Sequence, residues 1–347
     1  MTLTSKLLSR TTLLATTLGS ALLLGACASM PATSLAPPHP PLVEGRTVDV
    51  VPYPDQRKLL ASRDPALAAN KRLVFDMWRT LFNAGQLEKA DQFLSPNYQE
   101  HSIVVPNGVA GFARYHSARI TRQNTVPALI TDPIVTMVAE GDYVAVARVA
   151  HYLEPDDSGA SYTTTYFDVF RLDNGRIAEH WDSAQIVPGE IPLSAAQGGA
   201  VPVTGTEGFP QLAMLQNTNP VLANNKRLAF DLWRHTSEAG REEMAYNYLD
   251  PIYIQHNPNA VTGRDGFIEY MAMRPDTLID PYLEAPLITA IAEGDLVVQV
   301  LVGERRDPNH EGVIVKIAWI DMFRMQDGRV IEHWDTAAKG EYPKTPN

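Results

Sequence analysis

The chain has 347 residues, which is enough for two ordinary domains. With 45% hydrophobic and 20% charged residues, its composition is that of a globular protein in which each half can bury a core. The formal net charge of -11 at pH 7 argues against nucleic acid or anionic lipid as the main partner, because an acidic surface repels phosphate groups.

The first 26 residues predict a cleavable signal peptide. Lys6 and Arg10 give it a positive start, and the mostly apolar run over residues 11–24 is too short for a stable membrane span. This run ends in Leu-Gly-Ala before Cys27, the only cysteine of the chain, and resembles the lipobox of bacterial lipoproteins. The resemblance implies that Cys27 becomes the lipidated N-terminus. The alternative is an ordinary signal peptide followed by an incidental cysteine.

A lipid on Cys27 would be the only membrane anchor, because no other stretch is long and apolar enough to span a bilayer. Ala28 follows the cysteine, and the lipoprotein resemblance then implies sorting to the outer membrane of a Gram-negative cell. We therefore expect a protein of the cell envelope, lipid-anchored on the periplasmic side of the outer membrane. A single cysteine excludes an intrachain disulfide.

Two segments have the composition of linkers. Residues 27–66 are rich in Pro, Ala and Ser and predict a tether that cannot bury enough surface to fold. Residues 189–219 contain several Gly and Pro and predict an interdomain linker. Within this linker, Leu212, Met214 and Leu215 are candidates for docking on a domain surface.

An internal repeat determines the predicted architecture. The run Asn-Lys-Arg-Leu at residues 70–73 returns 155 residues later, at residues 225–228. The run Glu-His-Trp-Asp at residues 179–182 returns 153 residues later, at residues 332–335, so one net deletion of two residues aligns the halves. We therefore predict two homologous domains, at residues 67–188 and 220–342.

Each domain is predicted to begin with helices and to end with strands. In the first domain, apolar residues from Leu73 to Phe82 recur with the period of a helix, and Gly85 is a candidate C-cap. A short strand is expected after Tyr98. Two further helices are predicted at residues 87–94 and 108–118, and four strands at 134–139, 143–153, 162–172 and 176–186. Helices followed by antiparallel strands predict an α+β domain.

Three motifs resemble those of the SnoaL-like polyketide cyclases, within the nuclear-transport-factor-2-like superfamily. They are Tyr-x-Gln-His-Asn-Pro at residues 253–258, Glu-Gly-Asp at 293–295 and the closing Glu-His-Trp-Asp at 332–335. The resemblance covers nearly all of both domains. It implies two cone-shaped α+β barrels, each a curved antiparallel sheet with helices and a pocket on its concave face. It leaves the reaction open, because this fold hosts hydrolases, isomerases, cyclases and pure binding proteins.

The hairpin formed by the last two strands allows a prediction of register. The loop Asp-Asn-Gly at residues 173–175 suits a three-residue turn with glycine in the left-handed position. That turn would place His180 opposite Asp168 and Asp182 opposite Tyr166. Alternation along the strands then puts one set of side chains on the pocket face of each domain. These sets are Tyr166, Asp168, Phe170, His180 and Asp182 in the first domain, and Trp319, Asp321, Phe323, His333 and Asp335 in the second.

Two carboxyl groups and an imidazole on a half-buried face suggest acid–base chemistry, because burial can bring a carboxyl pKa towards neutrality. Asp335 is the candidate general base next to a carbonyl, and His333, held by Asp321, is the candidate for orienting it or stabilising an enolate. Asp182, His180 and Asp168 are their equivalents. The family resemblance implies the same acid/base and histidine positions. The cyclases, however, carry a histidine where this chain has Asp168 and Asp321, which places polyketide-ring closure in doubt.

His101 and His256 are predicted to line the pocket, with a hydrogen-bonded structural role as the alternative. No metal is expected, because His-x-Asp spacing alone is a poor ligand signature. The chain has no nucleophilic-serine motif, phosphate-binding loop or dinucleotide fingerprint, so catalysis would need no cofactor.

Two functions follow from these patterns. The first is a pair of domains that each enclose a small, mostly apolar organic molecule, with cofactor-free cyclisation, isomerisation or hydration as the candidate chemistry. The second is a non-catalytic binding or interaction module. In it, the outer sheet faces pair as an internal pseudo-dimer, and exposed Trp181 and Trp334 make the contact.

Overall fold

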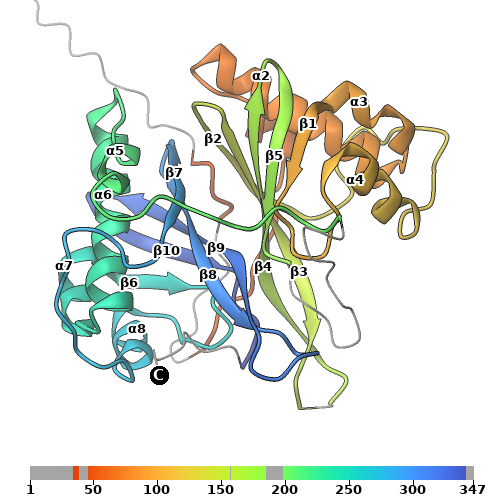
Figure 1. Cartoon of the computed structure of the whole chain (residues 1–347). Helices are drawn as coiled ribbons and strands as arrows, with labels where there is room; N and C mark the ends of the chain where they lie inside the picture. Colours follow the sequence, from red (N-terminus) through yellow and green to blue (C-terminus); the bar gives the residue numbers. More distant parts are fainter. Residues whose placement is uncertain (1–33, 39–45, 157, 185–197, 341–347) are drawn as a thin grey trace, which may run out of the picture. The chain divides into compact units, whose positions relative to one another are not determined.

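A computed structural model of the chain describes residues 34–38, 46–156, 158–184 and 198–340 (Figure 1). The predicted signal peptide, Cys27 and the first part of the predicted linker lie outside these residues. Across the described part of the chain, no helix is both long enough and apolar enough to cross a membrane.

The first repeat begins with helices, as predicted. Asp64 caps the main helix by accepting a hydrogen bond from Ala66 N, and Pro65 occupies the first turn, where its missing N–H is not needed. Gly85 ends the helical stretch with a φ of +60°, which a glycine adopts without strain. The helical segments are α1 (Gln56–Leu59), α2 (Pro65–Met77), η1 (Trp78–Asn83), η2 (Leu87–Lys89), α3 (Ala90–Phe93) and α4 (Gly108–Ser117).

A five-stranded sheet completes the first repeat. Its strands are β1 (Leu94–Glu100), β2 (Ile134–Glu140), β3 (Tyr143–Leu153), β4 (Ser161–Asp173) and β5 (Arg176–Asp182). Their order is β1-β5-β4-β3-β2, and all neighbours are antiparallel except β1, which runs parallel to β5. The sheet is therefore mixed, and the prediction of a purely antiparallel sheet is wrong.

The second repeat has the same plan. Its helical segments are α6 (Pro220–Leu232), η4 (Trp233–Glu238), η5 (Glu242–Met244), α7 (Ala245–Tyr248) and α8 (Arg264–Met271). Its strands are β6 (Leu249–Gln255), β7 (Leu287–Glu293), β8 (Leu296–Arg306), β9 (Ile314–Gln326) and β10 (Arg329–Asp335), in the order β6-β10-β9-β8-β7. The predicted fold class, two α+β domains of the cone-like type, is confirmed.

The turn of the closing hairpin differs from the prediction. Asp173 pairs with Arg176 across a two-residue turn, in which Asn174 and Gly175 have φ values of 49° and 72°. Positive φ at both positions is the geometry that Asn-Gly favours, so the predicted three-residue turn is wrong. A bulge at Ala178 then shifts the pairing by one further residue.

The two shifts change the pairing but keep the faces. Asp168 lies opposite Asp182, and Phe170 lies opposite His180, so the predicted pairing of His180 with Asp168 is wrong. Because a total shift of two residues restores the alternation, all four side chains still share one face of the sheet.

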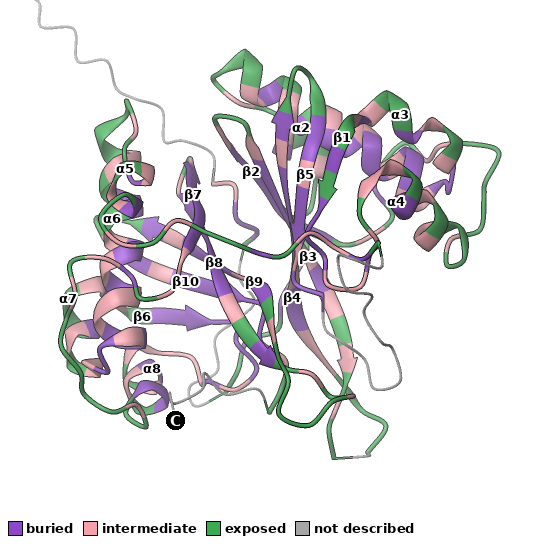
Figure 2. Ribbon diagram, in the orientation of Figure 1, coloured by how far each residue is buried: buried purple, intermediate pink, exposed green. Residues whose placement is uncertain are grey.

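Each sheet is largely buried on both faces, which explains why its strands are rich in hydrophobic residues. One face packs against the helices of its own repeat; in the first repeat, Met137 and Val146 lie in that core with Trp78 and Phe112. Figure 2 shows that the strands of both sheets are largely buried along their length. The other face needs a different cover.

That cover is the other repeat. A single hydrophobic cluster contains Val138 and Val169 from the first sheet together with Val300 and Ile320 from the second. We call this cluster the shared core. Trp181 and Trp334 both belong to it, with exposures of 4% and 0%. The two tryptophans point away from the pocket face as predicted, but the expectation that they are exposed is wrong.

Two reciprocal ion pairs also connect the repeats. Lys71 of α2 lies 2.9 Å from Glu293 at the end of β7, and Lys226 of α6 lies 2.7 Å from Glu140 at the end of β2. Each glutamate also accepts a backbone N–H from the edge strand of the other repeat, at 2.9 Å and 2.5 Å. The two sets occupy equivalent positions of the repeats, so the contact is nearly symmetric.

Parts of the predicted tether and linker are packed. Leu35 O accepts a hydrogen bond from Thr136 Oγ1, and Val50 is 3% exposed within the shared core. The tether is therefore not without structure over its described residues, because its apolar side chains find cover against the repeats. In the linker, helix α5 (Gln211–Met214) leads to Leu215, which is buried beside Leu287. This docking agrees with the prediction.

Candidate functional site

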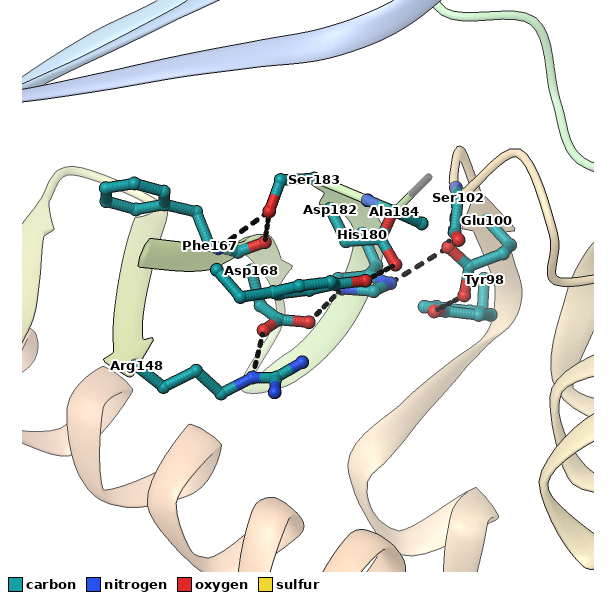
Figure 3. Close-up of polar contacts among 11 residues, drawn as sticks. Tyr98, Glu100, Ser102, Arg148, Phe167, Asp168, His180, Asp182, Ser183 and Ala184 are labelled. Carbon is teal, nitrogen blue, oxygen red and sulfur yellow. Dashed lines mark hydrogen bonds and ion pairs between the residues drawn. The ribbon is translucent and has the colours of Figure 1, made fainter. Parts of the chain in front are cut away.

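The pocket face of the first repeat carries a histidine held between two carboxyl groups (Figure 3). His180 Nδ1 lies 2.9 Å from Glu100 Oε1, and its Nε2 lies 3.1 Å from Asp168 Oδ1. The ring also stacks on Phe170, with a centroid distance of 4.7 Å. All of these side chains are buried, so the imidazole is fixed on both of its polar edges and on one face.

The three acidic groups around His180 have further donors. Glu100 accepts from Tyr98 Oη at 2.5 Å, and Asp168 accepts from Arg148 Nε at 3.3 Å. Asp182 accepts from Tyr166 Oη at 3.0 Å and from a backbone N–H at 3.1 Å. Among the described residues, Asp182 is not hydrogen-bonded to the group around His180, but one side-chain atom each of Asp168, His180 and Asp182 lies within 4.8 Å of the others. The first repeat therefore brings together every predicted catalytic residue of this repeat.

The charges of these groups favour a protonated histidine. Burial alone would lower the pKa of His180, but the charge of Glu100 and the hydrogen bonds to Asp168 and Glu100 hold that pKa well above its usual value. Burial also raises the pKa of Asp182 to about 6. His180 is thus an imidazolium at neutral pH, compensated by two carboxylates.

The second repeat keeps the histidine but changes one of its neighbours. His333 Nε2 lies 3.0 Å from Asp321 Oδ1, as in the first repeat, but its Nδ1 lies 2.9 Å from Gln255 Oε1. Gln255 Oε1 also accepts from Asn257 N, and Gln255 Nε2 donates to Tyr253 Oη, which fixes the orientation of the amide. His333 Nδ1 is therefore the donor to Gln255.

The loss of one carboxylate reverses the protonation of the pair. Burial lowers the pKa of His333 to about 4 and raises the pKa of Asp321 well above its usual value. Burial also raises the pKa of Asp335, whose Oδ2 accepts from Asn257 Nδ2 at 2.6 Å. Because His333 is neutral at pH 7 and its Nδ1 carries the hydrogen bonded to Gln255, the hydrogen between Asp321 Oδ1 and His333 Nε2 belongs to Asp321. This histidine–aspartate pair is therefore neutral, where the equivalent pair of the first repeat is ionic.

A cavity lies on the pocket face of the second repeat. It contains about 460 Å³ of space not filled by atoms, its open mouth included. The lining residues are Leu232, Trp233, Ser237, Tyr253, Gln255, Asn257, Phe267, Tyr270, Met271, Arg274, Trp319, Asp321, Phe323, His333 and Asp335. All of them belong to the second repeat, and the predicted catalytic and aromatic residues of that repeat are among them.

One substitution between the repeats lies at the wall of this cavity. Ser237 of the cavity wall stands where the first repeat has Phe82, whose ring packs 5.0 Å from Trp78 and 5.7 Å from Phe112. The first repeat therefore has a packed aromatic ring at the position where the cavity wall of the second repeat has a small hydroxyl side chain.

The two other predicted pocket histidines lie elsewhere. His101 stacks on Trp181 at 4.7 Å, and His256 stacks on Trp334 at 4.9 Å with its Nε2 2.8 Å from Glu332. Their ring partners belong to the shared core, so the prediction that these histidines line the pocket is wrong. The residue before each histidine points into the pocket instead, because neighbouring strand residues face opposite sides.

Four residues of the two sites were not predicted from the sequence. Glu100 and its equivalent Gln255 precede the histidines and follow Tyr98 and Tyr253 by two residues, so alternation from the buried tyrosines would have found them. Arg148 faces Tyr166 across β3 and β4, and the predicted strands contained that signal. Arg274 follows α8 in a segment without a motif, and nothing in the sequence singles it out.

The structure also places a third donor beside each His-x-Asp pair. In Asp168–His180–Asp182 and in Asp321–His333–Asp335, one ligand-type atom of each residue lies within 4.8 Å of the others. In each set, however, the histidine and the first aspartate already hydrogen-bond directly. Hydrogen bonds within the protein thus occupy the nitrogen and oxygen atoms that would otherwise coordinate a cation.

Comparison with protein families decides the assignment. The model of the SnoaL-like polyketide cyclase family matches residues 72–188, and the model of the SnoaL-like domain matches residues 230–333. The chain belongs to the SnoaL-like family, with two domains in tandem. No curated protein sequence matches the chain. SnoaL-like domains are ligand-binding and cyclase-type folds, and the cavity of the second domain is the candidate ligand site.

Solved structures of similar proteins each match only part of the chain. A putative polyketide cyclase from Acidithiobacillus ferrooxidans is 20% identical, covering 35% of this chain and 89% of its own, with a TM-score of 0.25. The putative polyketide cyclase IdmH from Streptomyces antibioticus is 20% identical, covering 33% and 89%, with a TM-score of 0.23. An NTF2-like protein of unknown function from Burkholderia pseudomallei is 16% identical, covering 33% and 88%, with a TM-score of 0.24. At these values, the names of the relatives carry no information about the activity of the two SnoaL-like domains.

Proposed function

We propose that the second SnoaL-like domain binds a small, mostly apolar organic molecule and performs acid–base chemistry on it without a cofactor. The observation that supports this proposal most directly is the cavity, whose walls are largely apolar and aromatic. The same walls include Asp321, His333 and Asp335. An apolar pocket with a few convergent polar groups of shifted pKa is the usual setting of proton transfer.

Asp335 is the proposed general base. Its two oxygens accept from Asn257 Nδ2 and from the backbone N–H of Ala337, which fix the carboxyl group at the cavity wall. Burial raises its pKa, and a carboxylate of raised pKa takes a proton from carbon more readily. His333 Nδ1 donates to Gln255 and Asp321 donates to His333 Nε2, so this neutral pair would stabilise an enolate only where the bound oxygen takes over one of these two hydrogen bonds. Aldol cyclisation, isomerisation and hydration all fit these roles.

The first SnoaL-like domain is proposed to be a folded support rather than a second active site. Its His180 is compensated by Glu100 and Asp168, and Phe82 fills the position that is open in the second domain. A polar network in which the members satisfy one another stabilises a fold and leaves little for a ligand to bind. If neither domain turns over a substrate, both domains are non-catalytic, and the chain is a binding or interaction module.

The pairing of the domains as an internal pseudo-dimer is part of the proposal. The shared core and the reciprocal lysine–glutamate pairs support it. We also propose that the chain is lipid-anchored through Cys27 in the cell envelope, on the signal-like N-terminus alone. Mass spectrometry of the mature N-terminus tests the anchor. A diacylated Cys27 is expected, and an unmodified N-terminus elsewhere would exclude it.

Hydrogen–deuterium exchange tests the acid–base chemistry. A panel of small aromatic ketones, including phenylacetone, is incubated with the chain in D2O, and loss of the signals from the protons next to the carbonyl is followed by NMR. We expect wild-type protein to accelerate exchange over buffer and Asp335→Asn to reduce that rate by about 100-fold or more. Asp182→Asn, at the equivalent position of the first domain, is expected to keep it.

Two results would count against this assignment. Full exchange in Asp335→Asn would remove the general base. No acceleration by wild-type protein with any ketone of the panel would leave the binding module as the better description of the second domain.

A further inference from the structure

One cationic side chain lines the cavity of the second domain. Arg274 follows the end of α8, where its backbone N–H donates to Met271 O at 3.0 Å. Among the described residues, its guanidinium has no hydrogen-bond acceptor and no carboxylate as an ion-pair partner. An arginine without a counter-ion at a half-buried position is costly, because a charge that loses water needs another charge or several acceptors in return.

The acidic groups around Arg274 are already engaged. Glu238 accepts the backbone N–H groups of Glu284 and Ala285 at 2.9 Å and 3.0 Å, and burial raises its pKa to about 7. Asp321 is bonded to His333, and burial raises its pKa well above the usual value. At neutral pH, therefore, neither Glu238 nor Asp321 offers the guanidinium of Arg274 a fully ionised carboxylate as an ion-pair partner.

The first domain offers a direct comparison. Arg119, at the position equivalent to Arg274, is exposed and lies 3.7 Å over the ring of Tyr115. The guanidinium inside that domain comes from Arg148 instead, and it pairs with Asp168. Only in the second domain, within the described residues, does an arginine line the cavity without a protein counter-ion.

We propose that the ligand of the second domain is a small organic acid, with its carboxylate bound by Arg274. The planar guanidinium matches a carboxylate with two parallel hydrogen bonds, which makes arginine the usual residue for this recognition. Trp233, Met271 and Phe323 line the cavity beside it and suit an apolar or aromatic body. The carboxylate site stands on the geometry of Arg274. The placement of a carbonyl at Asp335 rests on the proposed function.

Calorimetric titration of the full chain with a matched pair of probes tests the proposal. The probes are 3-phenylpropanoate and 3-phenylpropanamide, which have the same shape and differ in charge. We expect wild-type protein to bind the carboxylate at least tenfold more tightly than the amide. Arg274→Leu should abolish this preference, and Arg274→Lys should keep part of it. Arg119→Leu, the equivalent change in the first domain, should leave the preference unchanged.

Three results would overturn the carboxylate site. They are equal affinity for both probes in wild-type protein, no binding of either probe, and a preference that survives in Arg274→Leu. The proposed chemistry fails independently of these outcomes. If the protein prefers the carboxylate probe but exchanges no ketone, the carboxylate site at Arg274 stands and the general base Asp335 fails. If it exchanges ketones but shows no preference, the general base stands and the carboxylate site fails.

Discussion

Glu100 and Gln255 occupy equivalent positions in the two domains, and each places a side-chain oxygen 2.9 Å from Nδ1 of the pocket histidine. The carboxylate of Glu100 is thus replaced by the amide of Gln255, which removes a negative charge but keeps the oxygen contact with the histidine Nδ1. The two histidines thus differ in charge while their geometry is nearly the same. This pair of residues offers the simplest way to convert one site into the other.

The first prediction concerns a reciprocal exchange of these residues. Glu100→Gln removes the charge that outweighs burial at His180, so we expect the pKa of His180 to fall below 6.5 and the ring to become neutral at pH 7.5. Gln255→Glu should raise the pKa of His333 from about 4 and make it an imidazolium. Nitrogen-15 NMR of the imidazole groups reports both changes directly, because neutral tautomers and imidazolium have distinct shifts. Unchanged ring charges in both variants would contradict this account.

The second prediction concerns stability and pH. Burial raises the pKa of Asp182 to about 6, above the unfolded value of 3.8, so the native state holds a proton that the unfolded chain has lost. The contribution of protonated Asp182 to the free energy of unfolding is complete below pH 3.8 and is lost as pH rises through 6. This loss lowers the free energy of unfolding by about 3 kcal/mol. Asp182→Asn should remove this slope and raise the free energy of unfolding at pH 7 by about 1 to 3 kcal/mol.

Urea unfolding at pH 4.5 and pH 7 measures the effect of Asp182→Asn. Asp156→Asn is the matched control, because that carboxyl group is solvent-exposed and its hydrogen-bond partner is Ser158. A parallel pH dependence in Asp182→Asn and wild-type protein would show that Asp182 titrates normally.

The sequence predicted the helices, the strands and the pocket face well, because periodicity and alternation are local properties. Gly85 ends the helical stretch, and the strands begin within one residue of their predicted starts at residues 134, 143, 162 and 176. The face of Asp168, His180 and Asp182 was predicted from a wrong register. The face of a strand residue changes with every one-residue shift and is restored by a shift of two. The errors at the turn and at the bulge were one residue each, so together they kept these side chains on the predicted face.

The difference between the two sites could not be predicted, because it depends on groups far apart in the chain. Glu100 reaches His180 through the parallel pairing of β1 with β5, which no local pattern indicates. The cover over Trp181 and Trp334 comes from the other repeat, so their burial depends on the packing of two domains. The space beside Ser237 likewise becomes visible only when the aromatic packing around Phe82 is known.

The third prediction concerns this space. Ser237→Phe restores the side chain that the first domain carries at the same position, and its ring should occupy the cavity. We expect binding of 3-phenylpropanoate to weaken at least tenfold and ketone exchange to fall with it. The converse change, Phe82→Ser, removes a partly buried, packed ring and should cost up to about 3 kcal/mol of stability. Thermal unfolding distinguishes these effects, since Ser237→Phe is expected to keep the melting temperature. Undiminished binding in folded Ser237→Phe would place the ligand elsewhere.

The fourth prediction concerns the contact between the repeats. Lys71 is fully buried, and it lies 2.9 Å from Glu293 of the other repeat. Lys71→Met would leave a carboxylate without its cation, and Glu293→Gln would leave a buried ammonium, so each change should cost about 3–5 kcal/mol. The double variant leaves neither charge unpaired, and we expect its loss to be well below the sum of the single losses.

A double-mutant cycle of urea unfolding measures this coupling. The control is the exposed pair of Arg122 and Glu88, whose atoms lie at 2.8 Å but whose side chains are about half exposed, at 56% and 51%. Solvent screens that pair, so its coupling should be about 0–1 kcal/mol. Equal coupling in the two pairs would mean that Lys71 and Glu293 are hydrated in solution. The shared core alone would then hold the repeats together, and the symmetric lysine–glutamate contacts would only fix their orientation.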